Sequence, residues 1–395
     1  MPSSDRRPLR VVVVAHNAVA ESNRRRLEAL AQLPDTHVAL LTPRWWFEEG
    51  RRVDVRRDAW WQVGRTLATG NGTRYVYLSG LAGLIRGWRP DVIDVHEEPF
   101  SLAALEVLLA RELLAPRAAL VFYSAVNVER RWRLPYRLAE RVVFAGADGA
   151  YVPNREVPGV LRAKGYSAPV EVIPLGVDAE RFAGARKAEL RMELPRPWIG
   201  FLGRLEPVKG VDVLIEAAAQ LTHPASVVIA GAGPEKSRLE GLVVARRLQD
   251  RIRFYGEVPY AEVPGFLKAL DVLVLPSKTL LPLHKEQFGR VLVEAMAAGV
   301  PVVGSSSGAV PEVIGEAGLV VPERDPSALA AALDMLLADP GLRQTLAERG
   351  RQRVMSQYAW PVLAARTREL YLRAAAHRQA RRAGVSRRET VGSGA

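Results

Sequence analysis

Two glutamates, Glu286 and Glu294, lie eight residues apart in a stretch that joins a loop to an apolar helix. Gly289 lies where the loop passes into the helix, so N–H groups of the first helical turn face an anion there. Glu294 lies in the second turn among apolar residues, where a carboxylate is costly unless it accepts hydrogen bonds. Sugar hydroxyls are suitable donors, and Glu286 reaches another part of the same ligand. The alternative interpretation makes Glu294 a capping or ion-pairing residue and Glu286 a solvated loop charge.

A second group of candidate residues follows the strand-like run at 197–203. Arg204 offers a planar fork that binds phosphate through two hydrogen bonds, and Lys209 offers a compact point charge. A loop after the first strand of a doubly wound sheet is where a ligand is expected. The structural alternative is a surface arginine and a lysine that begins a helix.

The residues present exclude several other kinds of site. The chain contains no cysteine, which excludes a disulfide framework, a thiolate nucleophile and a Cys-based zinc site. The six histidines are scattered and no Asp-x-Asp occurs, so we expect no metal. Gly231 and Gly233 lack the third glycine of the dinucleotide fingerprint, which argues against a dehydrogenase. We therefore expect no cofactor.

Short continuous apolar runs, typical of strands buried on both faces, alternate with helical patterns along the chain. The runs in the first half are 9–15, 37–41, 74–78, 91–95, 119–123, 149–152 and 170–173. After a restart at residue 197 they are 226–229, 252–255, 272–275, 300–303 and 318–321. The alternation predicts an α/β fold of two doubly wound, Rossmann-like domains, with the ligand site beyond the carboxyl ends of the strands, in a cleft between the domains.

With 395 residues the chain is too long for one ordinary core. We expect a disordered N-terminus (1–8), a first Rossmann-like domain (9–175), a linker (176–196), a second Rossmann-like domain (197–358), a crossover helix (359–380) and a disordered basic tail (381–395).

Three motifs together show a resemblance to a known family. They are Gly203-Arg204-x4-Lys209-Gly210, Gly231-x-Gly233-Pro234 and Glu286-x7-Glu294. Together they resemble the second domain of the retaining, nucleotide-sugar-dependent glycosyltransferases of family 4. That family has the GT-B fold, in which two Rossmann-like domains face each other and a C-terminal helix crosses back to the first.

The resemblance implies the following roles. The donor is a nucleoside diphosphate sugar, and configuration is kept through front-face attack. Arg204 and Lys209 hold the diphosphate, Glu294 the ribose hydroxyls, and Glu286 the transferred sugar near its reacting carbon, so that Arg204, Lys209 and Glu286 are the catalytic candidates. The other implied donor contacts are Gly203, Gly231, Gly233, Val258 beside the base, Phe288, Gly289 and Arg290.

The first domain departs from the family pattern. No glycine pair follows the first strand, and no histidine follows the run at 119–123, where family members often carry one. His96, with Glu97 and Glu98, is the candidate substitute. The acceptor-side candidates are His16, Asn17, His96, Glu97, Tyr123, Ser124 and Asn127.

Other functions use the same architecture. They are a sugar-nucleotide epimerase, a phosphorylase, and a nucleotide-sugar-binding scaffold that has lost activity. A phosphorylase needs a site for pyridoxal or inorganic phosphate, and the sequence shows no signature of either. Intact Arg204, Lys209, Glu286 and Glu294 argue against the scaffold.

The net charge of +12 and the segment 44–65 indicate which kinds of molecule the protein binds. Basic excess in the first half suits an acidic or phosphate-bearing partner, whereas no nucleic-acid motif is present. Between residues 44 and 65, four tryptophans are interleaved with arginines, including Arg51, Arg52, Arg56 and Arg57. This Trp–Arg segment is a packed loop, an acceptor site or a contact with anionic membrane.

The sequence also predicts the location of the protein in the cell. The uncharged stretch 295–311 is interrupted by glycine, proline and serine, so no membrane span is predicted. We predict a cytoplasmic enzyme, peripheral on the inner face of the membrane, that acts on a sugar acceptor in cell-surface glycan or glycolipid biosynthesis.

Overall fold

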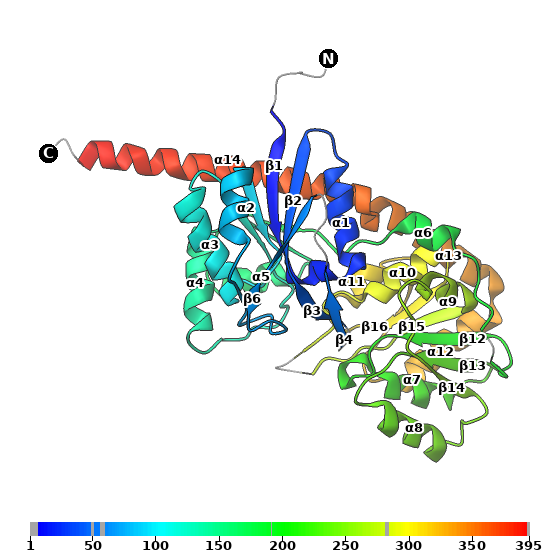
Figure 1. Ribbon diagram of the computed structural model, residues 1–395. Coiled ribbons are helices and arrows are strands. Elements are labelled where there is room, and N and C mark those ends of the chain that lie inside the picture. The colour runs from blue at the N-terminus through cyan, green and yellow to red at the C-terminus, as the bar shows by residue number, and fades with distance from the viewer. Residues whose placement is uncertain (1–6, 49–50, 56–59, 191, 281–283, 393–395) are drawn as a thin grey trace. The chain divides into compact units, whose positions relative to one another are not determined.

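The structure is a computed structural model of the chain and describes residues 7–48, 51–55, 60–190, 192–280 and 284–392. Contacts divide the chain into two compact units. Unit 1 comprises Met1–Pro153, Val157–Ile173 and Leu363–Ala395, and unit 2 comprises Asn154–Glu156 and Pro174–Val362. Each unit is built on one parallel sheet, which confirms the predicted pair of Rossmann-like domains (Figure 1).

The sheet of unit 1 has seven strands in the order β11-β10-β9-β8-β1-β2-β5, and every neighbouring pair is parallel. Its strands are β1 (Leu9–Val14), β2 (Thr36–Pro43), β5 (Trp61–Gly64), β8 (Val92–Val95), β9 (Ala119–Tyr123), β10 (Gly149–Val152) and β11 (Val170–Val172). The order confirms that apolar runs such as Val11–Val14 are strands buried on both faces.

One predicted strand differs from the structure. The run at 74–78 contributes only β7 (Val76–Tyr77), which pairs antiparallel with β6 (Thr66–Leu67) outside the main sheet. The backbone N–H of Tyr77 donates to the carboxylate of Glu106 at 2.8 Å instead of joining the main sheet. The edge strand β5 was not predicted, because its half-buried residues form no continuous apolar run.

Helices cover both faces of this sheet. Those of unit 1 are the 3-10 helix η1 (His16–Val19), α1 (Glu21–Ala31), α2 (Leu81–Trp88), α3 (Leu102–Leu114), α4 (Tyr136–Gly146), α5 (Val157–Ala163) and α14 (Trp360–Gly392). The helices α2, α3, α4 and α5 pack in one core with Ile93 and Val95 of β8. Asp94 points to the opposite face, because side chains alternate along a strand, and there it contacts α1 and α14.

The helix α14 packs on unit 1 from Leu363 onward. Leu370, Tyr371 and Ala374 are buried, and the Tyr371 hydroxyl donates to Asp94 Oδ2 at 2.5 Å. This confirms the predicted return of the C-terminal helix to the first domain. The helix continues to Gly392, so part of the segment 381–395, expected as a disordered tail, is helical.

The sheet of unit 2 has six parallel strands in the order β14-β13-β12-β15-β16-β17. They are β12 (Trp198–Leu202), β13 (Ser226–Ala230), β14 (Ile252–Gly256), β15 (Val272–Leu275), β16 (Val302–Ser305) and β17 (Gly318–Val321). The helices are α6 (Ala179–Gly184), η2 (Pro207–Lys209), α7 (Val211–Ala218), α8 (Lys236–Ala245), α9 (Val263–Ala269), α10 (Arg290–Ala298), α11 (Val310–Ile314), α12 (Pro326–Ala338), α13 (Pro340–Arg353) and the π-helix η3 (Val354–Tyr358).

The segment 176–196, expected as a linker, belongs to unit 2. Its helix α6 places Phe182 in the core of that unit, and Val177 is also buried there. The backbone N–H of Val177 donates to the carbonyl of Tyr358 at 2.9 Å.

Part of the Trp–Arg segment forms a small hairpin of β3 (Trp45–Glu48) and β4 (Arg51–Asp54). Trp46 is buried, and the guanidinium of Arg52 pairs with Asp54 while it lies over the Trp45 ring. The described part of the segment is therefore packed only in part, since Trp46 is buried whereas Phe47 and Arg52 are exposed. Arg56 and Arg57 lie outside the described residues.

Within the described part of the chain, no helix combines the length and hydrophobicity needed to span a bilayer.

Candidate active site

A buried ion pair occupies the carboxyl edge of the sheet in unit 2. Lys209 ends the turn η2 after β12, and Glu286 lies in the loop between β15 and α10. The strands β12 and β15 are neighbours, so the loops after them meet at one edge. There Lys209 Nζ lies 2.7 Å from Glu286 Oε2, and the Ser277 hydroxyl donates to the same oxygen at 2.8 Å.

These contacts determine the charge of Glu286. Its burial works to raise the pKa, but the charge of Lys209 and the hydrogen bonds from Lys209 and Ser277 outweigh burial and lower the pKa below the ordinary value. Glu286 is therefore an anion at neutral pH. It can accept hydrogen bonds from hydroxyls or face developing positive charge, but it cannot supply a proton.

The backbone of Glu286 is held by the loop that follows β16. The N–H of Ala309 donates to the Glu286 carbonyl at 3.0 Å, and Ser305 Oγ donates to the Ser277 carbonyl. The loop after β16 thus supports the loop after β15. Such support keeps the Glu286 side chain in one position.

Glu294 lies in the second turn of α10 and is only 6% exposed. Burial raises its pKa, partly opposed by the charges of Arg290 and Arg181. The structure gives its carboxylate no hydrogen bond to any described residue. A buried carboxylate in that state is ready to accept donors from a ligand, and ribose hydroxyls supply such donors. The capping and ion-pairing interpretation has less support, since no short ion pair forms within the described chain.

The glycines predicted to contact the donor line the same edge. Gly203 follows β12, and Gly231 and Gly233 follow β13, its neighbour. A Cβ atom on Gly231 would lie 1.9 Å from the carbonyl oxygen of Gly203, so the two loops approach each other backbone to backbone. Only glycine allows this approach.

Other predicted donor residues have differing surroundings. Arg204 is exposed and pairs with Glu206 at 2.9 Å. Phe288 is buried, with its ring centroid 6.0 Å from that of Tyr358, so only its backbone is available to a ligand. Gly289 caps α10 with a φ of 80°, and Arg290 begins the helix. Val258 follows β14 and is half-buried.

Unit 1 contains its own polar group at the carboxyl ends of β1 and β8. The backbone N–H of His16 donates to Glu97 Oε1 at 2.8 Å, and His16 Nδ1 lies 2.6 Å from Glu97 Oε2. Burial works to lower the pKa of His16, but the Glu97 carboxylate outweighs it, and the pKa is raised. The Tyr75 hydroxyl also donates to Glu97, at 2.6 Å.

The remaining acceptor-side candidates lie nearby in the sheet. His96 stacks on Tyr123 with 4.2 Å between ring centroids, and its Nδ1 lies 2.6 Å from the Tyr151 hydroxyl. The Ser124 hydroxyl donates to Glu98 at 2.7 Å. Burial raises the pKa of Glu98 to about 7, against hydrogen bonds from Ala125 and Ser124.

For two of the seven acceptor-side candidates, Asn17 and Asn127, the structure shows fewer contacts that bear on a site. Asn127 is buried, and the backbone carbonyl of Asn17 accepts from the Asn23 side chain at 2.8 Å. Trp46, from the Trp–Arg segment, packs against His16, with 4.6 Å between the two ring centroids. Tyr75 was not predicted, because it approaches His16 and Glu97 only through the fold.

Among the described residues, no group of three or more His, Asp or Glu is arranged to hold a metal ion.

Comparisons with known proteins agree with the motifs. Residues 6–181 match the family described as Glycosyltransferase Family 4, and residues 185–353 match Glycosyl transferases group 1. A GDP-mannose-dependent alpha-(1-6)-phosphatidylinositol monomannoside mannosyltransferase of Mycobacterium tuberculosis is 34% identical over 288 residues, covering 69% of this chain and 74% of the relative. The chain belongs to glycosyltransferase family 4.

Two further proteins are similar to this family 4 enzyme, and their names differ from that of the mannosyltransferase. Glycogen synthase of M. tuberculosis is 31% identical over 313 residues, which cover 74% of this chain and 71% of the relative. D-inositol 3-phosphate glycosyltransferase of Xylanimonas cellulosilytica is 29% identical over 345 residues, which cover 82% and 75%. The family 4 enzyme is thus a retaining glycosyltransferase that uses a nucleotide-sugar donor, as predicted.

Solved structures agree on the fold. Sucrose-phosphate synthase from Thermosynechococcus elongatus superposes with a TM-score of 0.70 at 22% identity, covering 94% of this chain and 100% of that chain. The Anabaena HepE complex with UDP has a TM-score of 0.68 at 18% identity, covering 91% and 99%. The family 4 enzyme has the predicted GT-B fold.

Proposed function

We propose that the donor site of this enzyme is the carboxyl edge of the sheet in unit 2. Lys209 and Arg204 bind the diphosphate of a nucleoside diphosphate sugar, Glu294 accepts hydrogen bonds from the ribose, and Glu286 faces the transferred sugar. The N-terminus of α10 adds a partial positive charge beside the phosphates. The observation that carries this assignment is the Lys209–Glu286 pair, which brings residues 77 positions apart into one buried contact.

The chemistry follows from where charge develops. The bond between the anomeric carbon and the diphosphate oxygen breaks, and its electron pair stays on the diphosphate. Fixed positive groups that face this oxygen stabilise the transition state more than the ground state. Lys209, Arg204 and the N-terminus of α10 supply such groups without a metal ion. Arg204 must exchange Glu206 for the phosphate, and its exposed position allows that exchange.

The acceptor is proposed to approach the polar group of unit 1 formed by His16, Glu97 and His96. Relatives are named for phosphatidylinositol monomannoside, D-inositol 3-phosphate and glycogen, which all offer hydroxyl groups. A cytoplasmic enzyme, peripheral on the membrane, is part of the proposal and is tested by cell fractionation.

The decisive experiment measures release of nucleoside diphosphate from GDP-mannose and UDP-glucose, with and without inositol phosphate, phosphatidylinositol or glycogen. We expect one donor to react, and faster with one acceptor. Lys209→Ala and Arg204→Ala should each lower kcat by about a hundredfold, which corresponds to roughly 3 kcal/mol of transition-state stabilisation. Lys236→Ala, on the exposed start of α8, is the matched control and should be unchanged.

Near-normal turnover of both Ala variants would contradict the proposed donor site. Binding of GDP or UDP without release from any donor and acceptor combination would contradict this choice of substrates.

A further inference from the structure

The helix α3 of unit 1 is apolar on two sides. Ala103, Ala104, Val107 and Leu108 face the core. Leu109 and Leu113, at helical spacing on another side, are exposed, and Leu113 is 82% exposed. A helix at the surface of a sheet normally has one apolar stripe toward the core and a polar outer face. The outer leucines of α3 therefore need a further explanation.

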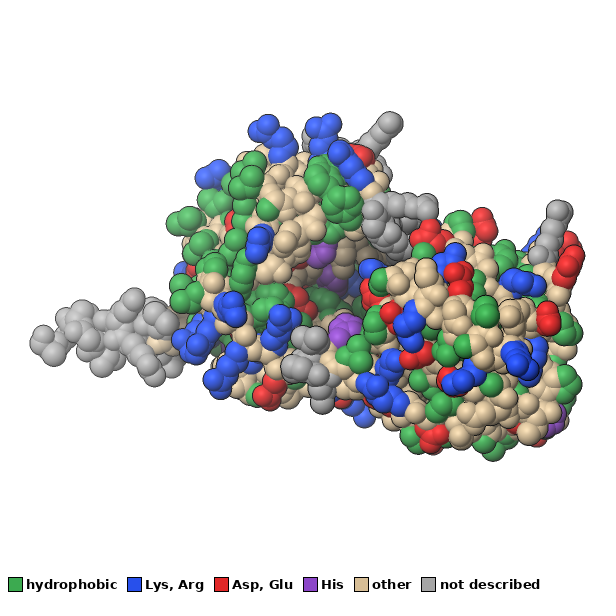
Figure 2. All heavy atoms as spheres, turned by 90° about the horizontal axis from the view of Figure 1, so that it is seen from below, with side chains coloured by type: hydrophobic (Ala, Val, Ile, Leu, Met, Phe, Trp, Pro, Cys, Tyr) green, Lys and Arg blue, Asp and Glu red, His purple; other side chains and the backbone are tan. Residues whose placement is uncertain are grey.

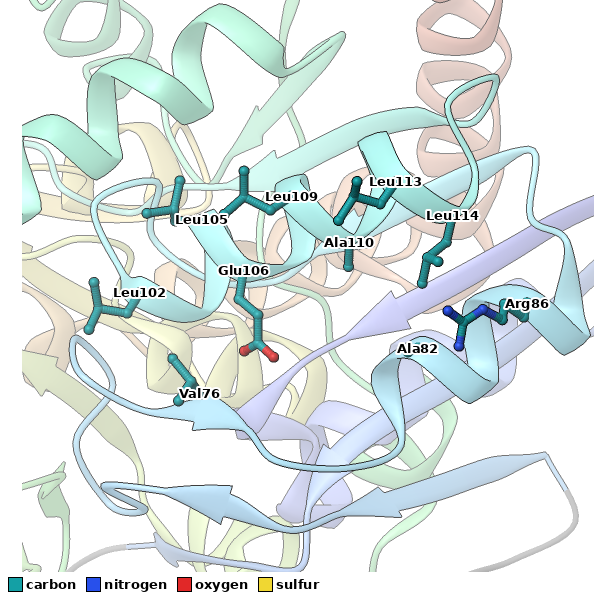
Figure 3. A pocket seen from close by; sticks show the side chains of 10 residues that line it. All are labelled: Val76, Ala82, Arg86, Leu102, Leu105, Glu106, Leu109, Ala110, Leu113 and Leu114. Atoms are coloured by element: carbon teal, nitrogen blue, oxygen red, sulfur yellow. The ribbon is translucent and has the colours of Figure 1, made fainter.

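The outer leucines border an apolar groove between α2 and α3. Figure 3 shows its lining side chains, with Ala82 and Arg86 on α2 and the leucines on α3. Its carboxylate, Glu106, accepts a hydrogen bond from the Tyr77 backbone, so this charge is already satisfied. The groove therefore offers a ligand mainly apolar surface. The complete lining is Val76, Ala82, Arg86, Leu102, Leu105, Glu106, Leu109, Ala110, Leu113 and Leu114.

The neighbouring helix α4 and the residues just before it also expose leucines. Leu134 just before it is 75% exposed, and Leu138 in its first turn is 56% exposed. Between and around these leucines are five exposed arginines. They are Arg130, Arg131, Arg133, Arg137 and Arg141.

None of these five arginines forms an ion pair with a described acidic residue. Arg130 lies over the Trp132 ring, at 4.7 Å from its centroid. Glu140, the acidic residue within α4, is buried and pairs with Lys164 at 2.7 Å. Positive charge on this side of unit 1 is therefore available to a partner.

The helices α3 and α4 pack against each other, since a Cβ on Gly146 of α4 would lie 2.5 Å from the Leu108 side chain of α3. In the space-filling view, hydrophobic and basic side chains gather on the left side of unit 1, the side on which Figure 1 draws these helices (Figure 2). We name this surface the α3–α4 face. It consists of Leu109, Leu113, Leu134, Leu138 and the five arginines.

We propose that the α3–α4 face docks on an anionic lipid bilayer, with its leucines in the outer acyl region and its arginines on the headgroup phosphates. Exposed leucines spaced by single helical turns gain free energy at the membrane interface, and unpaired arginines are complementary to anionic lipid. An acidic protein partner is less favoured, because leucines such as Leu113 and Leu134 stand almost fully exposed. This docking rests on the peripheral membrane location in the proposed function, but the face belongs to unit 1 and the proposed donor residues to unit 2. Vesicle binding can therefore fail while release of nucleoside diphosphate remains, and the two outcomes are distinguishable.

The first experiment is sedimentation with vesicles of phosphatidylcholine, alone or with phosphatidylglycerol. We expect uptake on the anionic vesicles, little on the neutral ones, and weakening with salt. Arg131→Ser/Arg133→Ser/Arg137→Ser should lower the partition coefficient roughly a hundredfold, at about fivefold per arginine. The matched control, Arg186→Ser/Arg253→Ser/Arg349→Ser, removes three exposed arginines of unit 2 and should bind as the wild type does. Both variants keep the arginines of α14 and of the Trp–Arg segment.

The second experiment reports which surface meets the lipid. Because the chain has no cysteine, Leu138→Cys can be labelled alone with an environment-sensitive dye. Its emission should shift to the blue on anionic vesicles. The control is Met335→Cys in unit 2, since Met335 is 55% exposed, almost as much as Leu138, and its label should not shift.

Equal binding by both triple-arginine variants, or absence of binding to anionic vesicles at low salt, would overturn the proposal. So would equal dye shifts at the two positions. A loss confined to the Arg131/Arg133/Arg137 variant, together with a shift only at position 138, would support it.

Discussion

Glu286 and Glu294 are the same residue type eight positions apart, yet their surroundings shift their pKa values in opposite directions. Lys209 and Ser277 satisfy Glu286 and hold its pKa low. Glu294 lacks such contacts, and burial raises its pKa. The first carboxylate is thus preorganised as an anion, whereas the second depends on donors from a ligand. This difference suits one group that faces the reacting sugar and one that binds the ribose.

Substitutions of the two glutamates should have different effects on nucleotide binding and on turnover. Glu294→Gln should weaken binding of GDP or UDP by about 1.5–3 kcal/mol, because it removes a charged hydrogen-bond acceptor. Glu286→Gln should leave that affinity nearly unchanged and lower turnover by about a hundredfold, because its proposed partner is the sugar. Calorimetry with the free nucleoside diphosphate and steady-state kinetics measure the two effects.

The matched control for these variants is Glu240→Gln on the exposed side of α8, which should affect neither quantity. Equal losses of nucleotide affinity in the Glu286 and Glu294 variants would contradict the division of roles.

His16 should make stability depend on pH through its contact with Glu97. The pKa of His16 is raised in the folded state, so its contribution is fully present below the unfolded value of about 6.5. It is lost as the pH rises through the folded value. The difference in free energy of unfolding between wild type and His16→Gln should therefore shrink from pH 6 to pH 9. Urea denaturation at several pH values measures it, and a difference that grows with pH would contradict the contact.

At the scale of elements, the proposed donor site depends on close packing between loops at the edge of one sheet. Gly210 follows Lys209 with a φ of 65°, and a Cβ atom there would lie 1.9 Å from the Pro276 carbonyl oxygen. The turn that carries Lys209 therefore rests directly on the strand end that precedes Ser277. This packing is what brings Lys209 and Ser277 to the same oxygen of Glu286.

Gly210→Ala should disturb both stability and activity. The left-handed conformation costs a residue with Cβ about 1–2 kcal/mol, and the contact with Pro276 adds to that cost. We expect at least about 2 kcal/mol of lost stability in urea denaturation, with a fall in turnover. Gly241→Ala in α8 is the control, because no atom lies within 4 Å of its Cβ and alanine favours a helix by up to about 1 kcal/mol. Equal stability of the two variants would show that the turn can move away from Pro276.

At the scale of the whole molecule, the basic residues that give the net charge of +12 lie in separate regions with different contacts. Lys209 and Arg204 belong to the proposed donor site in unit 2. Arg378 and Arg381 bind carbonyl oxygens of unit 1 and hold α14 on its sheet. The arginines of the α3–α4 face have no such partner among the described residues. Total charge alone therefore says little about any single partner.

The whole enzyme should keep its activity when divalent metal ions are removed. Its proposed stabilisation of the leaving diphosphate comes from two cationic side chains and a helix N-terminus, which chelation does not touch. Turnover should be the same in EDTA as in magnesium or manganese. A strict requirement for either metal would show that a further positive charge acts on the diphosphate.

Much of the fold follows from local patterns in the chain. Apolar runs such as those at 9–15 and 226–229 predict strands buried on both faces, and their alternation with helices predicts parallel sheets. The carboxyl-end rule then places the loops at Arg204 and Glu286 at one edge. Both inferences hold because they depend on neighbouring residues and on a general property of parallel sheets.

Other features arise from contacts between distant parts of the chain. The pairing of Lys209 with Glu286, and of Tyr75 and Trp46 with His16 and its partner Glu97, has no local signal. The exposed leucines of α3 are a similar case, because apolar residues lie on two sides of this helix and the sequence alone does not show which of them are buried. Each helix can place only part of its surface against the sheet and its neighbours, so packing decides which leucines remain exposed.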